Sequence, residues 1–176
     1  YRIIFIPETI GSIVYISRHL SHLKKKVIAG FVITCIGDNN NYSYLPSRNG
    51  NTLSDRASKS ALMYNVKNFK TYSFLDRGSD ERQFCSPNVD LPICSIMRSK
   101  YHEYSEYHTS EDDLKFISSE GLQGGFDILK KTLEIIEFNY IYKAKFPCEP
   151  QLGKYKLYPK MSIKDNYAES KNLINF

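Results

Sequence analysis

A few acidic residues and one histidine have the types and spacing that could carry chemistry. Glu8, Asp38 and Asp80 each follow an apolar run. His108 stands in residues 107–112, which read Tyr-His-Thr-Ser-Glu-Asp and end in a further carboxylate, Asp112. Glutamate and histidine can jointly bind zinc, and another carboxylate can accept a proton from metal-bound water. These residue types therefore indicate metal-assisted hydrolysis, provided that the fold brings them together.

Strands that alternate with helices must position these residues. Apolar runs predict strands at residues 2–7, 28–36, 69–75 and 91–97, with a short extra strand at 42–46. The run 28–36 is nearly continuous in apolar residues, which is typical of a central parallel strand. This alternation predicts an α/β fold with a mixed, mainly parallel sheet flanked by helices. Because ligands bind at the carboxyl ends of strands in such sheets, we expect the polar residues that follow strands to meet there.

Three helices are predicted between and after these strands. The first covers residues 9–20 and the second covers residues 53–66, where Asn51 or Thr52 could cap it. The longest begins at Ser118 or Ser119 and is expected to end near residues 143–145. Its predicted apolar face comprises Leu122, Phe126, Leu129, Leu133, Ile136 and Tyr140.

Composition limits the class of protein. The 176 residues carry 24 basic and 19 acidic side chains, a formal charge of +5, and 41% are apolar, which fits one globular domain rather than a disordered chain. Lysine and arginine are scattered, so the charge does not predict a nucleic-acid partner for this domain. No stretch has the length and hydrophobicity of a membrane span. The chain opens without Met or a signal-peptide pattern, and its four cysteines form no Cys-x-x-Cys pair, so we expect a piece of a longer cytoplasmic protein with free thiols.

Three segments in order resemble the co-catalytic zinc aminopeptidases, which are related to the glutaminyl cyclases. Residues 107–112 resemble the His-Thr-x-x-Asp motif of that family. Residues 79–92 are similar to its Ser-Asp-His, Phe, Gly-Ile-Pro stretch, and residues 5–12 to its strand, Glu-Glu, Gly-Ser segment. A closer resemblance, to bacterial aminopeptidase-like proteins of unknown function that are often linked to surface-polysaccharide loci, rests on residues 5–12, 43–52, 77–86, 96–101 and 147–153.

The resemblance implies a division of the chain. Residues 1–146 would form the C-terminal half of an aminopeptidase-like domain. Residues 147–176 would be a connector or tail that leads toward a winged-helix module absent from this chain. A domain that lacks its first half exposes strand edges and apolar surface, so we expect a homo-oligomer or an N-terminal half as partner.

The resemblance also implies roles for single residues. His108 matches the last zinc ligand of the family, and Glu8 falls where the family has a general base followed by a zinc ligand. Thr34 occupies the position of an aspartate that binds zinc in the family, so this ligand would be absent unless the nearby Asp38 substitutes for it. Asp112 would orient its loop. Because the first histidine ligand and the bridging aspartate of the family lie upstream of this chain, it would hold one zinc ion at most.

Other roles and readings remain open for the same residues. Asp80 would be a structural residue or part of the wall of the site, with Glu81 at the histidine of Ser-Asp-His, although residues 80–82 could equally form a salt-bridged loop. Glu8 could simply interact with the dipole of the following helix. Tyr104 and Tyr107 could line a pocket that stacks on a sugar ring or a peptide side chain.

Two functions follow from these observations. The first is metal-dependent, aminopeptidase-type hydrolysis of an N-terminal peptide or related amide bond, with a small peptide or amide-bearing substrate. The alternative is a non-catalytic binding module on the same fold, associated with surface-polysaccharide metabolism.

Overall fold

The structure is a computed structural model that describes residues 1–140, 143–145, 147–148 and 151–156. Contacts divide the chain into two units, Tyr1–Asn139 and Tyr140–Phe176. The described part of the second unit contains a short 3-10 helix, η2, at Leu152–Tyr155. Most of the predicted connector, residues 149–150 and 157–176, lies outside the described residues. No helix among the described residues is long and apolar enough to cross a membrane.

The first unit is built on a four-stranded sheet with the order β1-β4-β2-β3. The strands are β1 (Gly30–Ile33), β2 (Ser43–Leu45), β3 (Lys70–Thr71) and β4 (Ile93–Met97). β1 is parallel to β4 and β2 is parallel to β3, whereas β2 and β4 are antiparallel. The predicted mixed, mainly parallel sheet is confirmed. β1 is parallel as predicted, but it lies at an edge of the described sheet instead of its centre.

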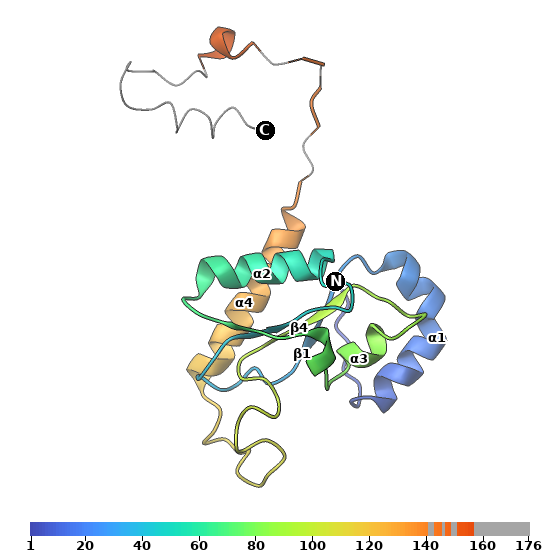
Figure 1. Cartoon of the computed structure of the whole chain (residues 1–176), viewed down its shortest axis with the longest axis vertical. Helices are drawn as coiled ribbons and strands as arrows, with labels where there is room; N and C mark the ends of the chain where they lie inside the picture. The colour runs from blue at the N-terminus through green and yellow to red at the C-terminus, as the bar shows by residue number, and fades with distance from the viewer. Residues whose placement is uncertain (141–142, 146, 149–150, 157–176) are drawn as a thin grey trace. The chain divides into compact units, whose positions relative to one another are not determined.

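Helices cover both faces of this sheet (Figure 1). They are α1 (Ile10–Lys26), α2 (Leu53–Asn65), α3 (Glu81–Phe84) and α4 (Ser119–Glu137). Side chains alternate along β4, so Cys94 and Ile96 pack with Leu62 of α2 and Ile128 of α4. Ile93 points the other way, into a second cluster with α1 and α3. The sheet is therefore the middle layer of an α/β/α arrangement.

The predicted first residues of the helices agree with the structure more closely than the predicted buried faces do. Thr52 caps α2 in a capping box with Asp55, and the side chain of Ser118 caps α4. α4 ends at Glu137 instead of near residues 143–145. Its buried face is formed by Gly121, Gly125, Ile128 and Thr132, whereas Leu122 and Phe126 of the predicted apolar face are 43% and 57% exposed.

Close approach of two backbones explains the orientation of α4. A Cβ at Gly121 would lie 2.1 Å from the carbonyl oxygen of Gly37, and one at Gly125 would lie 2.9 Å from that of Ile36. Only a helix face made of glycine can lie this close to the loop that follows β1. α4 therefore turns its glycines inward and leaves larger apolar side chains at the surface.

Two predicted strands are reduced or missing. Residues 2–7 form no strand, and Phe5 is 94% exposed, because no neighbouring strand offers this segment a hydrogen-bonded ladder within the described residues. Only two residues of the predicted strand 69–75 pair as β3. The chain then turns into a 3-10 helix, η1 (Phe74–Asp76), which Ser73 caps.

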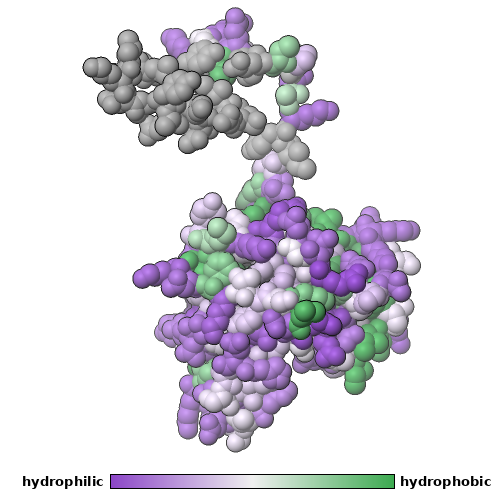
Figure 2. Space-filling view, viewed as in Figure 1, coloured by the Kyte–Doolittle hydropathy of each residue, from purple (hydrophilic) through white to green (hydrophobic). Residues whose placement is uncertain are grey.

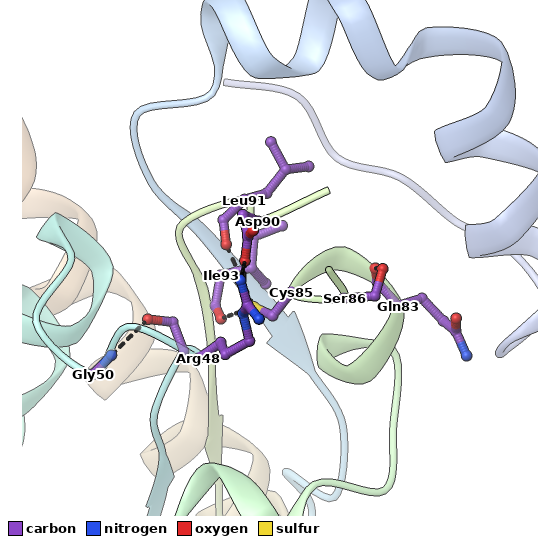
Figure 3. A network of polar contacts seen from close by, with 9 residues as sticks. Arg48, Gly50, Gln83, Cys85, Ser86, Asp90, Leu91 and Ile93 are labelled. Carbon is purple, nitrogen blue, oxygen red and sulfur yellow. Dashed lines mark hydrogen bonds and ion pairs between the residues drawn. The ribbon is translucent and has the colours of Figure 1, made fainter. Parts of the chain in front are cut away.

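A set of polar contacts holds the turn that connects α3 to β4 (Figure 3). The side chain of Arg48 donates from Nε to Asp90 Oδ1 at 2.7 Å. The thiol of Cys85 donates to the carbonyl oxygens of Leu91 and Ile93 at 3.4 and 3.1 Å. Cys85 is fully buried, and burial raises the pKa of its thiol. These contacts therefore fix the position of the turn from which β4 begins. All four cysteines are free, as expected.

Candidate functional site

A cavity of about 400 Å³ lies at the carboxyl ends of β1 and β4. The two strands are parallel, so the loops that follow them, residues 34–38 and 98–117, leave the same edge of the sheet. The second loop is the long yellow-green segment that projects from the sheet in Figure 1. The residues proposed from sequence that line the cavity are Glu8, Asp38, Tyr104, Tyr107, His108 and Asp112.

Glu8 reaches the cavity from the turn that precedes α1. The side chain of Thr9 does not cap this helix. Asp80 does so from outside, because its Oδ1 accepts the backbone N–H of Thr9 at 2.7 Å and the hydroxyl of Ser12 at 2.9 Å. Asp80 therefore does not line the cavity but anchors the turn that presents Glu8. The carboxylate of Asp80 thus holds the start of α1, and the structure gives no salt bridge within residues 80–82.

Asp38 lies at the cavity, and its carboxylate is held by several hydrogen bonds from the protein. It is 2% exposed, and its carboxylate joins the ends of β1 and β4. Oδ1 accepts the hydroxyl of Ser99 at 2.7 Å and the backbone N–H of Asn40 at 2.9 Å, while Oδ2 accepts the backbone N–H of Ser99 at 2.8 Å. The backbone oxygen of Asp38 also accepts the buried Arg98 Nε at 2.9 Å. This residue clamps the two loops together, and both of its carboxylate oxygens accept hydrogen bonds from the protein.

Aromatic rings from the second loop form one wall. Tyr104 stacks on Phe116 with ring centres 4.7 Å apart, and Tyr107 stacks on His108 at 4.0 Å. The hydroxyl of Tyr104 lies 3.5 Å from Sγ of Cys35, the residue that follows Thr34 at the end of β1. Partial burial raises the pKa of both tyrosines, so both carry a neutral hydroxyl near neutral pH. The wall therefore offers flat apolar faces edged by hydrogen-bonding groups.

Sequence reasoning missed the role of Glu81. This carboxylate is fully buried beneath the cavity. Its Oε1 accepts the backbone N–H groups of Gly78 and Ser79 at 2.9 and 3.0 Å and the hydroxyl of Tyr101 at 2.9 Å, while Oε2 accepts the hydroxyl of Ser95 at 3.1 Å. Burial, and then the charge of Glu81, raise the pKa of Tyr101, which lines the cavity. The one signal in the sequence that could have identified Glu81 is its position, because it replaces the histidine of the Ser-Asp-His motif.

The described residues do not form a complete metal site. No group of three or more histidine, cysteine or acidic side chains among them is arranged to hold a metal ion. Glu8 and His108 both line the cavity, but the carboxylate of Asp38 is engaged and Thr34 offers no carboxylate. Two candidate ligands are fewer than the three protein ligands that catalytic zinc usually has.

Comparisons with known proteins relate this chain to aminopeptidase-like proteins. A family model described as a domain of unknown function, DUF4910, matches residues 1–139. A protein of Clostridium acetobutylicum, named for polysaccharide biosynthesis and an aminopeptidase-like domain, is 40% identical over 159 residues, which are 90% of this chain and 36% of that protein. A crystal structure of a candidate peptidase from C. acetobutylicum has a TM-score of 0.76 and 38% identity, covering 84% of this chain and 35% of that chain.

More distant solved structures share the fold alone. An aminopeptidase from Aneurinibacillus sp. strain AM-1 has a TM-score of 0.60 at 20% identity, covering 72% of this chain and 30% of its own. A zinc aminopeptidase from Bacillus subtilis has a TM-score of 0.55 at 17% identity, covering 72% of this chain and 32% of its own. The chain thus spans about a third of the length of these proteins.

Proposed function

Since the chain belongs to the DUF4910 family and has an aminopeptidase-like fold, we propose that its cavity is the substrate-binding part of an aminopeptidase-type hydrolase. The observation that carries this proposal is the meeting of Glu8, His108 and Asp112 in one tyrosine-walled cavity at the carboxyl ends of two parallel strands. These residues come from segments about 100 positions apart in the sequence.

The charge of the cavity favours a substrate with an amino group. Glu8 and Asp112 are exposed acidic residues of the cavity, and none of the described residues that line it is lysine or arginine. An ammonium group, such as the N-terminus of a peptide, gains from nearby carboxylates, whereas an anionic ligand does not. Phe116, Ile117 and Leu122 add apolar wall that suits the side chain next to that amino group.

Glu8 is the group proposed for proton transfer. It follows Pro7 at a turn held by Asp80, and its exposed carboxylate can accept a proton from a water molecule that attacks an amide. Alternatively, Glu8 and His108 bind a zinc ion whose remaining ligands come from outside this chain. The described residues alone do not complete a site for it.

A non-catalytic binding module is the second candidate. Asp38 is engaged as a clamp, and Thr34 takes the place of a ligand aspartate, so the cavity keeps its shape without a full set of metal ligands. This candidate predicts that amino compounds bind in the cavity without zinc and without turnover.

The test compares this chain with the same chain preceded by the upstream region of the C. acetobutylicum relative. Bound zinc is measured by mass spectrometry, and hydrolysis is measured with leucine p-nitroanilide. Glu8→Gln should reduce hydrolysis by about 100-fold or more. His108→Ala should reduce it as well, and His22→Ala, at an exposed position on α1, is the matched control.

Each outcome separates the candidates. Activity at the level of the parent in the Glu8→Gln variant would refute the role of Glu8 in proton transfer. Absence of hydrolysis and of zinc, together with leucinamide binding that His108→Ala weakens, would favour the binding module.

A further inference from the structure

The turn between Glu8 and α1 has a rare backbone conformation. The N–H of Ile10 donates to the carbonyl oxygen of Glu8 at 2.7 Å, and Thr9 between them has φ 62° and ψ −65°. These angles and this hydrogen bond define a γ-turn with a positive φ at its centre, which is the strained form of this turn. Thr9 is also β-branched, and a positive φ is an outlier for such a residue. The turn that presents Glu8 to the cavity is therefore held in a costly conformation.

A less strained start of α1 is available to the same residues. Threonine is a favourable N-cap at a negative φ, because its hydroxyl then accepts a backbone N–H from the first turn of the helix. Thr52 does this at the start of α2, with φ −71°. Thr9 does not, since its side chain makes no capping hydrogen bond. Strain at a position that has a relaxed alternative is typical of sites where function depends on the local geometry.

Asp80 supplies the contacts that hold Thr9 in this conformation. Its Oδ1 accepts the N–H of Thr9 at 2.7 Å and the hydroxyl of the fully buried Ser12 at 2.9 Å. A change of φ at Thr9 from 62° to a negative value would rotate the preceding peptide group relative to α1. That rotation would turn the N–H of Thr9 away from Asp80 and would move the side chain of Glu8 with it.

Apolar packing on the outer side of α1 does not hold the turn. Ile10 is 72% exposed and Ile13 is 48% exposed. Figure 2 shows hydrophobic residues at the surface where α1 lies. On the inner side, a Cβ at Gly11 would lie 2.7 Å from the Cβ of Ile6, so the chain before the turn crosses close to the helix start. This crossing requires a tight reversal of the chain but leaves its angle to the hydrogen bonds of Asp80.

Asp80 is itself held in place relative to the sheet. The neighbouring Glu81 accepts the N–H of Ser79 at 3.0 Å and the hydroxyl of Ser95, in β4, at 3.1 Å. A chain of contacts therefore runs from β4 through Glu81 and Asp80 to Thr9. The strained turn is thereby fixed relative to the strand that ends at the cavity.

From these observations we infer that Asp80 is a positioning residue, which holds the strained turn at Thr9 and so directs the carboxylate of Glu8 into the cavity. The inference rests on the proposed function, in which Glu8 acts on the substrate or on a metal ion. Without Asp80 the turn relaxes to an ordinary cap, and Glu8 moves while the fold persists. Glycine adopts a positive φ without strain. The substitution Thr9→Gly should therefore reverse the effect of losing Asp80.

Hydrogen exchange at the amide of Ile10 reports the turn without any ligand. In Asp80→Ala this amide should exchange about 10-fold faster than in the parent, because an ordinary cap leaves it without a backbone acceptor. In the double variant Asp80→Ala/Thr9→Gly the slow exchange should return. Asp80→Asn keeps an oxygen that can accept both hydrogen bonds and should resemble the parent. Equal exchange in the parent and in Asp80→Ala would overturn the inference.

The position of Glu8 is measured by the hydrolysis of leucine p-nitroanilide, with the variants built in the longer protein used to test Glu8. Asp80→Ala should lower kcat about 10-fold with little change in KM, because a misplaced proton acceptor affects the reaction more than binding. The double variant should regain most of this loss, although it lacks the same two hydrogen bonds. A role of Asp80 in stability alone predicts no recovery. In a protein that binds without turnover, the affinity for leucinamide should follow the same order.

Matched glycine variants test the strain itself. Thr9→Gly should raise the urea midpoint, because relief of strain outweighs the freedom that glycine gains in the unfolded chain. Thr52→Gly is the control at an N-cap with an ordinary φ, and it should lower the midpoint because α2 loses its cap. A midpoint of Thr9→Gly below that of the parent would show that the turn is not strained.

Failure of this inference differs from failure of the proposed function. If Glu8→Gln leaves hydrolysis unchanged, the proposed function is refuted, while exchange at Ile10 still tests the hold of Asp80 on the turn. If Glu8→Gln abolishes hydrolysis and Asp80→Ala leaves kcat unchanged, the positioning role is refuted alone. Should Asp80→Ala not fold, the double variant must fold and keep kcat near that of the parent, and a low kcat there would contradict the inference.

Discussion

The fit between α4 and the loop after β1 predicts the effect of a single methyl group. In Gly121→Ala, the added Cβ would lie 2.1 Å from the carbonyl oxygen of Gly37 and 2.5 Å from that of Asp38. These are backbone atoms that cannot rotate away. The helix or the loop must therefore move by more than 1 Å to restore an ordinary contact distance of about 3.5 Å.

Two opposing terms decide the size of the effect. Alanine favours a helix over glycine by about 1 kcal/mol. Overpacking at a tight contact costs about 1–3 kcal/mol, and here it also disturbs the hydrogen bonds that Asp38 makes with Ser99. The 2.1 Å approach to backbone puts the overpacking cost in the upper part of that range, about 2–3 kcal/mol. Since the gain in helix propensity offsets about 1 kcal/mol of it, we expect Gly121→Ala to lower the free energy of unfolding by about 1–2 kcal/mol.

The assay is urea denaturation followed by circular dichroism, with Gly124→Ala as the matched control. At Gly124 a Cβ would meet the ends of two side chains, the hydroxyl of Tyr42 and a nitrogen of Arg98, instead of backbone. Arg98 is buried and hydrogen-bonded, but the end of a side chain gives way more readily than backbone, so the loss should be smaller than at Gly121. A Gly121→Ala variant that is as stable as the parent would refute the argument that backbone contact sets the orientation of α4.

Two further predictions concern buried or anchoring carboxylates. Burial opposes ionisation of Asp55, but hydrogen bonds from Ser47, Thr52 and Tyr44 outweigh burial and lower the pKa of its carboxyl. The ionised carboxylate therefore stabilises the folded state above about pH 4, and this stabilisation is lost as the pH falls through the lowered pKa. Urea midpoints at pH 6 and pH 3 should therefore differ less in Asp55→Asn than in the parent, and an equal difference would contradict this. Asp80→Ala should cost about 1–2 kcal/mol, because the N–H of Thr9 loses its acceptor and the hydroxyl of Ser12 loses one of its two. The measurement is thermal denaturation, with Glu111→Ala at an exposed position as the control, and equal losses of stability in the two variants would count against the anchor.

The sequence by itself determined the features that depend on neighbouring residues. Capping residues such as Thr52 and Ser118 predicted where helices begin, because a cap needs only residues within one turn. Strand ends predicted where polar residues would gather, because parallel strands finish at one edge of a sheet. Glu8, Asp38 and His108 accordingly line one cavity, although each lies on a different segment.

Tertiary contacts decided what each of these residues does. Asp38 clamps two loops, and Asp80 anchors a helix start 68 to 71 positions away, through partners that no local pattern indicates. The buried face of α4 was fixed by the approach of Gly121 to another backbone, against the hydrophobic pattern of the helix itself. Residues 2–7 have the composition of a strand but form none, because a strand is stable only beside a partner that completes its hydrogen bonds.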